Sequence, residues 1–299
     1  MYYVNGRLKI KFNLFLKVKI YMLTEKLENM IIEELKHQTE LLSIELKCER
    51  KNCSVFDSKL GGIPYMPRNF EYPFELPVEN NEPLRLLAQL NFEQLPILPN
   101  FPQKGILQFF VATTSEYGAD FDEPLNTAGF RVIYHPNIIK NKDMLNFDVP
   151  NLIYDDANCF PFDGEFALTS KLVKQPITTD DFRFDKILSN IYKKYTNEKI
   201  NSLRDIHDIN NSFFCKLLEN FNEEGHRIGG YPHFEQYDLR DNNYYKNYTT
   251  LLLQIDSGLF PTTKDEICWG DGGVANFFIE PEKLKICDFT HVLYTWDCG

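Results

Sequence analysis

Gly61-Gly62-Ile63-Pro64-Tyr65 recurs further along the chain as Gly229-Gly230-Tyr231-Pro232-His233, and two more motifs recur after it in the same order. These are Leu86-Leu87-Ala88-Gln89-Leu90 with Leu251-Leu252-Leu253-Gln254-Ile255, and Gly105-Ile106-Leu107-Gln108-Phe109-Phe110-Val111 with Gly273-Val274-Ala275-Asn276-Phe277-Phe278-Ile279. The outermost glycines of the set are 44 residues apart in both copies (61 to 105 and 229 to 273). Ordered self-similarity is the signature of a repeated architecture. We therefore expect an internal duplication, with two pseudo-symmetric β-rich halves that share one core.

The matched motifs lie in short apolar runs that are typical of strands. The expected strands are Leu84–Phe92, Gly105–Thr113 and Phe130–Tyr134 in the first half, and Thr250–Ile255, Asn276–Glu280 and Val292–Trp296 in the second. Side-chain alternation predicts that Leu87, Gln89 and Asn91 share one face of their strand, with Leu86, Ala88, Leu90 and Phe92 on the other. No strand–helix–strand pattern occurs at short range, so a parallel nucleotide-binding sheet is not expected.

Helical periodicity appears in two places outside the strands. Leu27, Met30, Ile31, Leu35, Leu42 and Leu46 form one apolar stripe after Thr24, which could cap the helix, and Ile187–Tyr195 and Phe213–Phe221 carry two more. The expected fold class is therefore α+β and mainly antiparallel, with an N-terminal helix and a central helical insertion. One domain is expected over residues 22–299, with a first half at about 54–170, a helical connection at about 178–225 and a second half at about 226–299.

Residues 1–21 differ from the rest of the chain because they hold five Lys or Arg residues and no acid. Apolar and polar residues alternate there, so the segment has neither the continuous apolar stretch nor the cleavage site of a secretory signal. We consider three interpretations: a misassigned start with translation from Met22, a basic strand or tail, and a membrane-surface or targeting segment. The first is preferred, and residues 1–21 are treated as a doubtful basic extension.

Composition excludes some classes of function for the remainder. The 299 residues carry a formal charge of −11, and nucleic-acid binding depends on clustered Lys and Arg, so no nucleic-acid partner is expected. No apolar run is long enough to span a membrane. The 7 cysteines have irregular spacings without zinc half-sites, which favours reduced thiols in the cytoplasm. No metal ligands, catalytic residues or cofactor are assigned.

Four carboxamides recur at matched places on otherwise apolar strands: Gln89, Gln108, Gln254 and Asn276. Such side chains stay in an apolar setting only when their hydrogen bonds are satisfied. They could bond loop backbone and each other, or they could line a polar cleft between the halves that binds a peptide or small ligand. Trp269 and Asp271 complete the candidate binding residues, with Trp269 either a binding anchor or a buried core residue whose N–H bonds the chain.

Several motifs resemble the YwqG family of bacterial cytosolic proteins. They are Gly61-Gly62-x-Pro64, Leu86–Phe92, Gly105-x-x-Gln108-Phe109, Tyr117-Gly118-x-Asp120, Phe130-Arg131-Val132-x-Tyr134, Gly229–Pro232, Leu252–Ser257, Trp269-Gly270-Asp271, Phe277-Phe278-Ile279 and Leu293-Tyr294-x-Trp296-Asp297-Cys298. Where the family tends to have Asp-Pro-Arg, this chain has Asp238-Leu239-Arg240. The resemblance covers about residues 24–299 and implies an antiparallel α+β fold with duplicated halves. It supplies no activity, although the context of family members suggests an immunity-type binding role.

No motif of an established catalytic class is present. Gly270–Ala275 fits the dinucleotide pattern G-x-G-x-x-A, but a strand-like run and not a helix follows it, so we interpret it as a turn. The expected function is that of a non-enzymatic cytoplasmic module that binds a basic protein or a small ligand. The alternative is a hydrolase-like enzyme with a cleft between the repeats, in which Asp271 or a histidine acts as acid or base.

Overall fold

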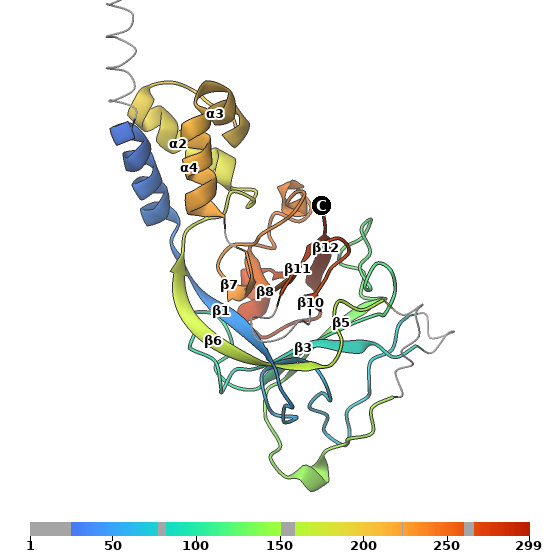
Figure 1. Cartoon of the computed structure of the whole chain (residues 1–299). Coiled ribbons are helices and arrows are strands. Elements are labelled where there is room, and N and C mark those ends of the chain that lie inside the picture. The colour runs from blue at the N-terminus through green and yellow to red at the C-terminus, as the bar shows by residue number, and fades with distance from the viewer. Residues whose placement is uncertain (1–24, 77–81, 151–158, 223, 260–265) are drawn as a thin grey trace, which may run out of the picture. The chain divides into compact units, whose positions relative to one another are not determined.

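The computed structural model describes residues 25–76, 82–150, 159–222, 224–259 and 266–299, which divide into two compact units (Figure 1). The described part of the helical unit consists of residues 25–40 and 176–222. The β unit consists of Leu41–Gln175 and of the chain after the helices, to Gly299. The expectations for residues 1–21 and for Thr24 lie outside the described residues.

The helical unit contains the N-terminal helix and the central helices that the sequence predicts. A helix covers residues 25–39, and the later helices are α2 (Phe184–Thr196), α3 (Leu203–Ile209) and α4 (Asn211–Phe221). Phe184 and Phe221 pack edge to face, with ring centroids 5.7 Å apart. Asn210 caps α4, since its side chain accepts a hydrogen bond from the Phe213 N–H.

The N-terminal helix ends earlier than its apolar stripe suggests. The chain leaves the helix after residue 39, and Leu42 and Leu46 lie on strand β1 (Leu41–Arg50). Residues four apart lie on the same face in a strand as well as in a helix. The spacing of Leu42 and Leu46 therefore could not distinguish a helix from a strand. The assignment of Leu42 and Leu46 to a helix was therefore wrong.

The β unit is built on one antiparallel sheet with the strand order β12-β11-β8-β7-β1-β6-β2-β3-β4-β5 in the described part of the chain. The remaining strands of this sheet are β2 (Lys59–Gly61), β3 (Arg85–Asn91), β4 (Ile106–Val111), β5 (Phe130–His135), β6 (Glu165–Gln175), β7 (His226–Gly229), β8 (Thr250–Asp256), β11 (Val274–Ile279) and β12 (Val292–Asp297). A small hairpin joins β9 (Gly258–Leu259) to β10 (Glu266–Ile267), and helix α5 (Pro281–Lys285) follows β11. All six strands expected from the motifs are confirmed, within a few residues at their ends.

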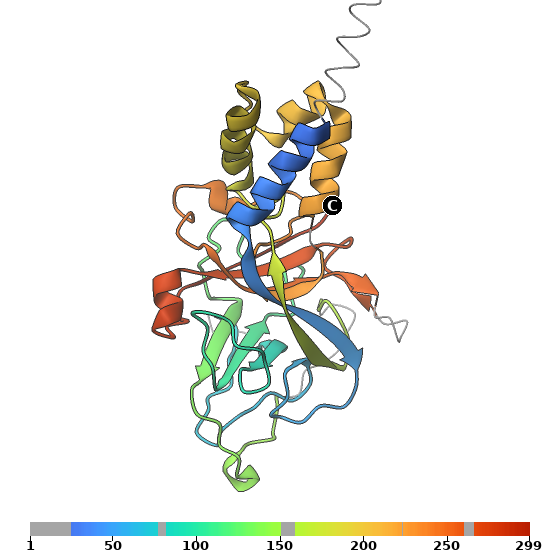
Figure 2. The same cartoon turned by 90° about the vertical axis from the view of Figure 1, so that its left-hand side faces the viewer.

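Strands β1 and β6 form a long, twisted antiparallel pair at the centre of the sheet (Figures 1 and 2). They pair from Leu41 opposite Gln175 to Arg50 opposite Phe166. On its other side β1 pairs with β7, and β6 pairs with β2. The pair therefore connects the strands of the first half to those of the second.

A β-bulge occurs at a matched position in each half. The pairing of β3 with β4 passes over Leu87, and the pairing of β8 with β11 passes over Leu252. The bulge places Leu87 in the same apolar cluster as Ala88 and Leu90, whereas Leu86 belongs to another cluster. The predicted division of this strand into two faces was therefore wrong at Leu86 and Leu87, because an extra residue interrupts strict alternation.

Both halves contribute to one apolar core inside the β unit. Phe109 of β4 lies edge to face with Phe277 of β11, with ring centroids 5.0 Å apart, and Phe277 stacks on Tyr294 of β12 at 4.3 Å. The loop after β4 covers the outer edge of β12, where Tyr294 N–H donates to the Pro124 carbonyl over 3.0 Å. This loop and the end of β12 frame the cavity described below.

Candidate functional site

Gln89 on β3 is fully buried and is bonded by the chain segments on either side of β2. Its Oε1 accepts hydrogen bonds from the Tyr65 backbone N–H and from Gln108 Nε2, both at 2.8 Å. Its Nε2 donates to the carbonyls of Val55 and Asp57, both at 2.9 Å. These bonds use the polar atoms of the carboxamide to hold the loop against the sheet.

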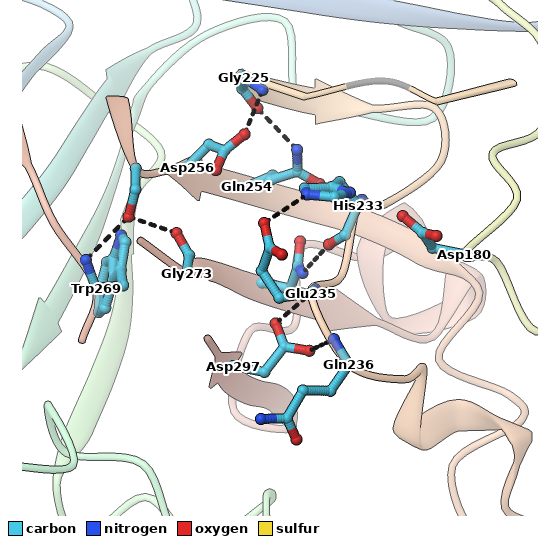
Figure 3. A network of polar contacts seen from close by, with 12 residues as sticks. Asp180, Gly225, His233, Glu235, Gln236, Gln254, Asp256, Trp269, Gly273 and Asp297 are labelled. Carbon is cyan, nitrogen blue, oxygen red and sulfur yellow. Dashed lines mark hydrogen bonds and ion pairs between the residues drawn. The ribbon is translucent and has the colours of Figure 1, made fainter. Parts of the chain in front are cut away.

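The second half repeats this arrangement with fewer bonds (Figure 3). Gln254 Oε1 accepts the His233 backbone N–H at 2.7 Å, and its Nε2 donates to the Gly225 carbonyl at 2.7 Å. Asn276 Nδ2 donates to the His233 carbonyl at 2.8 Å. In both halves the carboxamides bond loop backbone, as in the first of the two interpretations, and their role as ligand contacts remains a prediction.

Trp269 and Asp271 adjoin each other in the chain but differ in environment. The Trp269 side chain is fully buried and lies edge to face with Tyr117 at 5.1 Å. Its indole N–H has no acceptor within the described residues, so it does not make the bond expected of a core tryptophan. Asp271 is exposed in the turn before β11. The Gly270–Ala275 segment leads from this turn into β11, as predicted.

A cavity of about 820 Å³ lies where the end of β12 meets two loops. Its lining comes from three separate segments: Phe121, Asp122 and Pro124; Phe234, Gln236, Tyr237, Asp238, Leu239, Asp241, Asn242 and Tyr245; and Thr295, Trp296, Asp297 and Cys298. None of the six candidates from the sequence is among these residues. Its volume is within the usual range for small-molecule pockets.

Aromatic rings form much of the cavity wall. Trp296 contacts Phe121, with ring centroids 5.8 Å apart, and its indole N–H donates to the Glu116 carbonyl at 2.8 Å. The Tyr117 ring packs edge to face against Trp296, with ring centroids 4.9 Å apart. Tyr237 is 72% exposed and Phe121 is 55% exposed, so both rings remain available to a ligand. Trp296 is thus held in a fixed orientation, while the rings of Phe121 and Tyr237 remain exposed to solvent.

The charged residues that line the cavity are all aspartates: Asp122, Asp238, Asp241 and Asp297. Arg240 neutralises Asp238 through a bidentate ion pair, with Nη2 2.6 Å from Oδ2 and Nε 2.9 Å from Oδ1. No such partner is recorded in the described part of the chain for the carboxylates of Asp122 and Asp241, which are both exposed. The cavity is therefore negatively charged as well as aromatic.

Asp297 is fixed at the cavity wall by backbone N–H groups (Figure 3). Its two carboxylate oxygens accept hydrogen bonds from Glu235 N–H at 3.3 Å and from Gln236 N–H at 2.8 Å. Burial raises its pKa above the ordinary aspartate value, against the effect of these bonds. A cation bound at this wall would lower the pKa of Asp297 and so stabilise its charged carboxylate.

Two polar atoms beside Asp297 have no hydrogen-bond partner within the described residues. Thr295 lines the cavity and is only 7% exposed, and no bond of its hydroxyl is recorded there. Asn276 lies opposite Thr295 in the sheet, and its buried Oδ1 is also without a partner in that part of the chain. Thr295 lines the cavity, so a ligand there could bond its hydroxyl, whereas Asn276 is fully buried and does not line the cavity.

His226 and Asp256 form a further polar contact next to Gln254 (Figure 3 shows Asp256). His226 Nδ1 accepts the Asp256 backbone N–H at 3.1 Å, and an Asp256 oxygen accepts the Gly225 N–H at 2.5 Å. Burial, with the charge of Arg227, lowers the pKa of His226 to about 4. The neutral ring is required because a protonated ring cannot accept the Asp256 N–H.

This contact predicts acid sensitivity. Between pH 6.5 and pH 4 the unfolded His226 binds a proton that the folded one does not, so stability falls as pH falls through this window. His226→Asn keeps an acceptor but does not titrate. Between pH 7 and pH 5 we therefore expect its free energy of unfolding to fall by about 2 kcal/mol less than that of the parent chain. Urea unfolding at both pH values measures this, with the exposed His291→Asn as control. Equal pH dependence in His226→Asn and the parent chain would contradict the assignment.

The described residues contain no group of three or more His, Cys, Asp or Glu side chains placed to hold a metal ion. None of the helices in the described ranges has the length and apolar character needed to cross a membrane.

Sequence reasoning did not identify the cavity, although a usable signal was present. Trp296 and Asp297 belong to the last of the motifs that carry the family resemblance, and Trp296 is one of only 2 tryptophans. Asp238 and Asp241 lie in a loop that had been noted only for a small departure from the family pattern. Their proximity depends on the pairing of β12 with β11, which no local pattern reveals.

A search of the curated proteins found no match to this chain. A family profile described as a domain of unknown function (DUF1963) matches residues 58–298, which include both copies of every repeated motif. The description names no activity and does not include the YwqG name, which remains an expectation. Since the match covers most of its length, the chain belongs to the DUF1963 family, a family of unknown function.

Proposed function

We propose that the β unit is a binding module, and that the cavity beside Trp296 holds a positively charged group of its ligand. The observation that carries this proposal is the lining of the cavity, which combines aromatic rings with four aspartates and includes no Lys, Arg or His. Arg240, from outside the lining, neutralises one of the four, Asp238, and leaves three. A cation against an aromatic face contributes about 0.5–2 kcal/mol, and a bond to a carboxylate contributes more than a neutral one. An immunity-type role with a basic partner is one form of this proposal.

A non-enzymatic role is preferred to the hydrolase alternative. Asp271, the acid or base of that alternative, is exposed in a turn and does not line the cavity. His233 is 7% exposed, and its ring contacts Glu235 at 3.2 Å.

An internal duplication is part of this proposal, and the cavity lies beside β12 of the second half, with further lining from the first-half loop after β4. In the sheet, β1 to β5 occupy positions that mirror those of β6, β7, β8, β11 and β12, taken in that order. Exchanging each strand with its counterpart therefore reverses the strand order without otherwise changing it. The matched bulges at Leu87 and Leu252 and the matched bonds of Gln89 and Gln254 also support this proposal. Under it, the first half starts with β1 and the second with β6, both earlier than the expected bounds of about 54 and 226, and each of these strands pairs into the other half.

The two halves differ at the cavity. In the first half, His135 Nε2 bonds Gln108 Oε1 at 3.0 Å, and the rings of Tyr65 and Phe70 pack on His135 at 5.1 and 5.3 Å. Asp297 is the matched residue on β12, and a cavity lies beside it instead of packed rings. An opening retained in one copy and filled in the other is consistent with a binding role.

Titration of the full chain with arginine amide, followed by NMR and tryptophan fluorescence, tests the proposal. We expect Asp297→Asn to weaken binding by about tenfold, because one charge-assisted contact is lost. The single amide oxygen can accept only one of the two backbone N–H bonds, so NMR also checks that the variant keeps its fold. Acetyl-arginine amide should also bind, and acetyl-citrulline amide, which has the same shape without a charge, should bind more weakly to the parent chain.

Asp271→Asn is the matched control, since it removes an exposed aspartate from the same half outside the cavity. It should leave the affinity unchanged. If Asp271→Asn weakens binding as much as Asp297→Asn, the turn and not the cavity is the site. If acetyl-arginine amide and acetyl-citrulline amide bind equally, the proposal of a cationic ligand is wrong.

A further inference from the structure

A second hollow of about 400 Å³ adjoins the first. Phe121 and Asp122 line both, so the Phe121 ring stands at the boundary between them. The charged residues of the second hollow are again all acidic: Glu75, Glu116, Asp120 and Asp122. The acidic surface is therefore elongated, and it extends further than one cationic group requires.

The two ends of this surface have different chemistry. Trp296, Tyr237 and Tyr245 surround the first hollow, whereas Gly118, Ala119, Ala128 and Gly129 leave the second hollow shallow and without large rings other than Phe121. Burial and the nearby charge of Glu82 raise the pKa of Glu75, so acidic groups are crowded at the far end. A ligand with several separated positive charges would relieve this crowding along its length.

Strand β12 is an edge strand of the sheet, and its outer side is only partly covered. The Tyr294 N–H points away from β11, because it bonds the Pro124 carbonyl. In an antiparallel pair every second residue points the same way, so the N–H and C=O of Trp296 also face outward. No partner for the Trp296 backbone N–H is recorded within the described residues. The first hollow thus has an unpaired strand edge at its wall.

We propose that the two hollows hold an extended basic segment of a partner protein, which pairs its backbone with Trp296 at the edge of β12 and places Arg or Lys side chains along the aspartates and glutamates. This inference rests on the proposed function and adds the kind of partner. Strand addition to a free sheet edge is a common mode of peptide recognition. Thr295 is largely buried at the cavity wall, and its hydroxyl is a further contact for such a segment.

Calorimetry with the full chain and matched probes tests the inference. The probe is acetyl-Arg-Ala-Arg-Ala-Arg-amide, compared with arginine amide, with spermidine, and with the same peptide N-methylated at its alanines or at its arginines. Each methylated peptide keeps the charges but loses one set of backbone N–H groups. We expect the peptide to bind at least about tenfold more tightly than arginine amide and than spermidine, and one of the two methylated peptides to lose about tenfold.

The variant Glu116→Gln tests whether the basic segment occupies the second hollow, because Glu116 lines that hollow and not the first. It should weaken the peptide about tenfold and leave arginine amide unchanged. If the peptide binds no more tightly than arginine amide, or if spermidine or both methylated peptides match it, the inference is wrong while the proposed function stands. If neither the peptide nor arginine amide binds, the proposed function itself is wrong.

Discussion

Asp238→Ala is expected to destabilise the β unit by about 3–5 kcal/mol, because it leaves a buried guanidinium without its carboxylate. Arg240 is fully buried, and its two bonds to Asp238 are 2.6 and 2.9 Å long. Its guanidinium carbon also lies 4.0 Å from the centre of the Phe278 ring, so water cannot easily replace the lost partner. Urea unfolding followed by tryptophan fluorescence measures the effect, since both tryptophans, Trp269 and Trp296, belong to the β unit.

Asp241→Ala is the matched control for this change. Asp241 lies three residues further on and also lines the cavity, but it is exposed. It should change stability by less than about 0.5 kcal/mol. The double variant Asp238→Ala with Arg240→Met should recover much of the loss, because removing both charges leaves no unpaired ion. A single variant as stable as Asp241→Ala would show that the pair does not support this loop.

The fold was predictable where the chain repeats itself and not where its strands are half exposed. The motif strands β3, β4, β8 and β11 are buried along nearly their whole length and therefore appear as continuous apolar runs. Strand β6 has only Phe166 and Gln175 buried among its residues, so its apolar pattern is weak. The central β1–β6 pair was missed for this reason, although it joins the two halves.

The candidate site was harder to predict because it depends on contacts between distant segments. The carboxamides of Gln89 and Gln254 stood out as polar residues in apolar strands, and the prediction that backbone could satisfy them agrees with their bonds. The cavity has no comparable local sign. Trp296 stands out in the sequence as one of only 2 tryptophans, but nothing local connects it with Phe121 or Tyr237. The three rings line one cavity only when distant segments meet beside β12.

Gln89→Leu is expected to cost about 3–5 kcal/mol of stability, which is the second large effect. The substitution keeps the volume of the side chain but removes every bond of the carboxamide. The Tyr65 N–H and the carbonyls of Val55 and Asp57 then remain buried without this partner, at a cost of about 1–3 kcal/mol for each unsatisfied group, less whatever the loop recovers by moving toward water. Urea unfolding measures the loss in the same way as for Asp238→Ala.

Gln254→Leu should cost less, because Gln254 bonds two backbone groups and not three, and the exposed Gln103→Leu should change little. This ranking separates a structural role from a ligand role for the carboxamides. If they hold loops, the loss of stability follows the number of backbone bonds, and arginine amide still binds to the folded fraction. If Gln89→Leu instead keeps full stability and abolishes binding, the carboxamides are ligand contacts and the site is not the cavity beside Trp296.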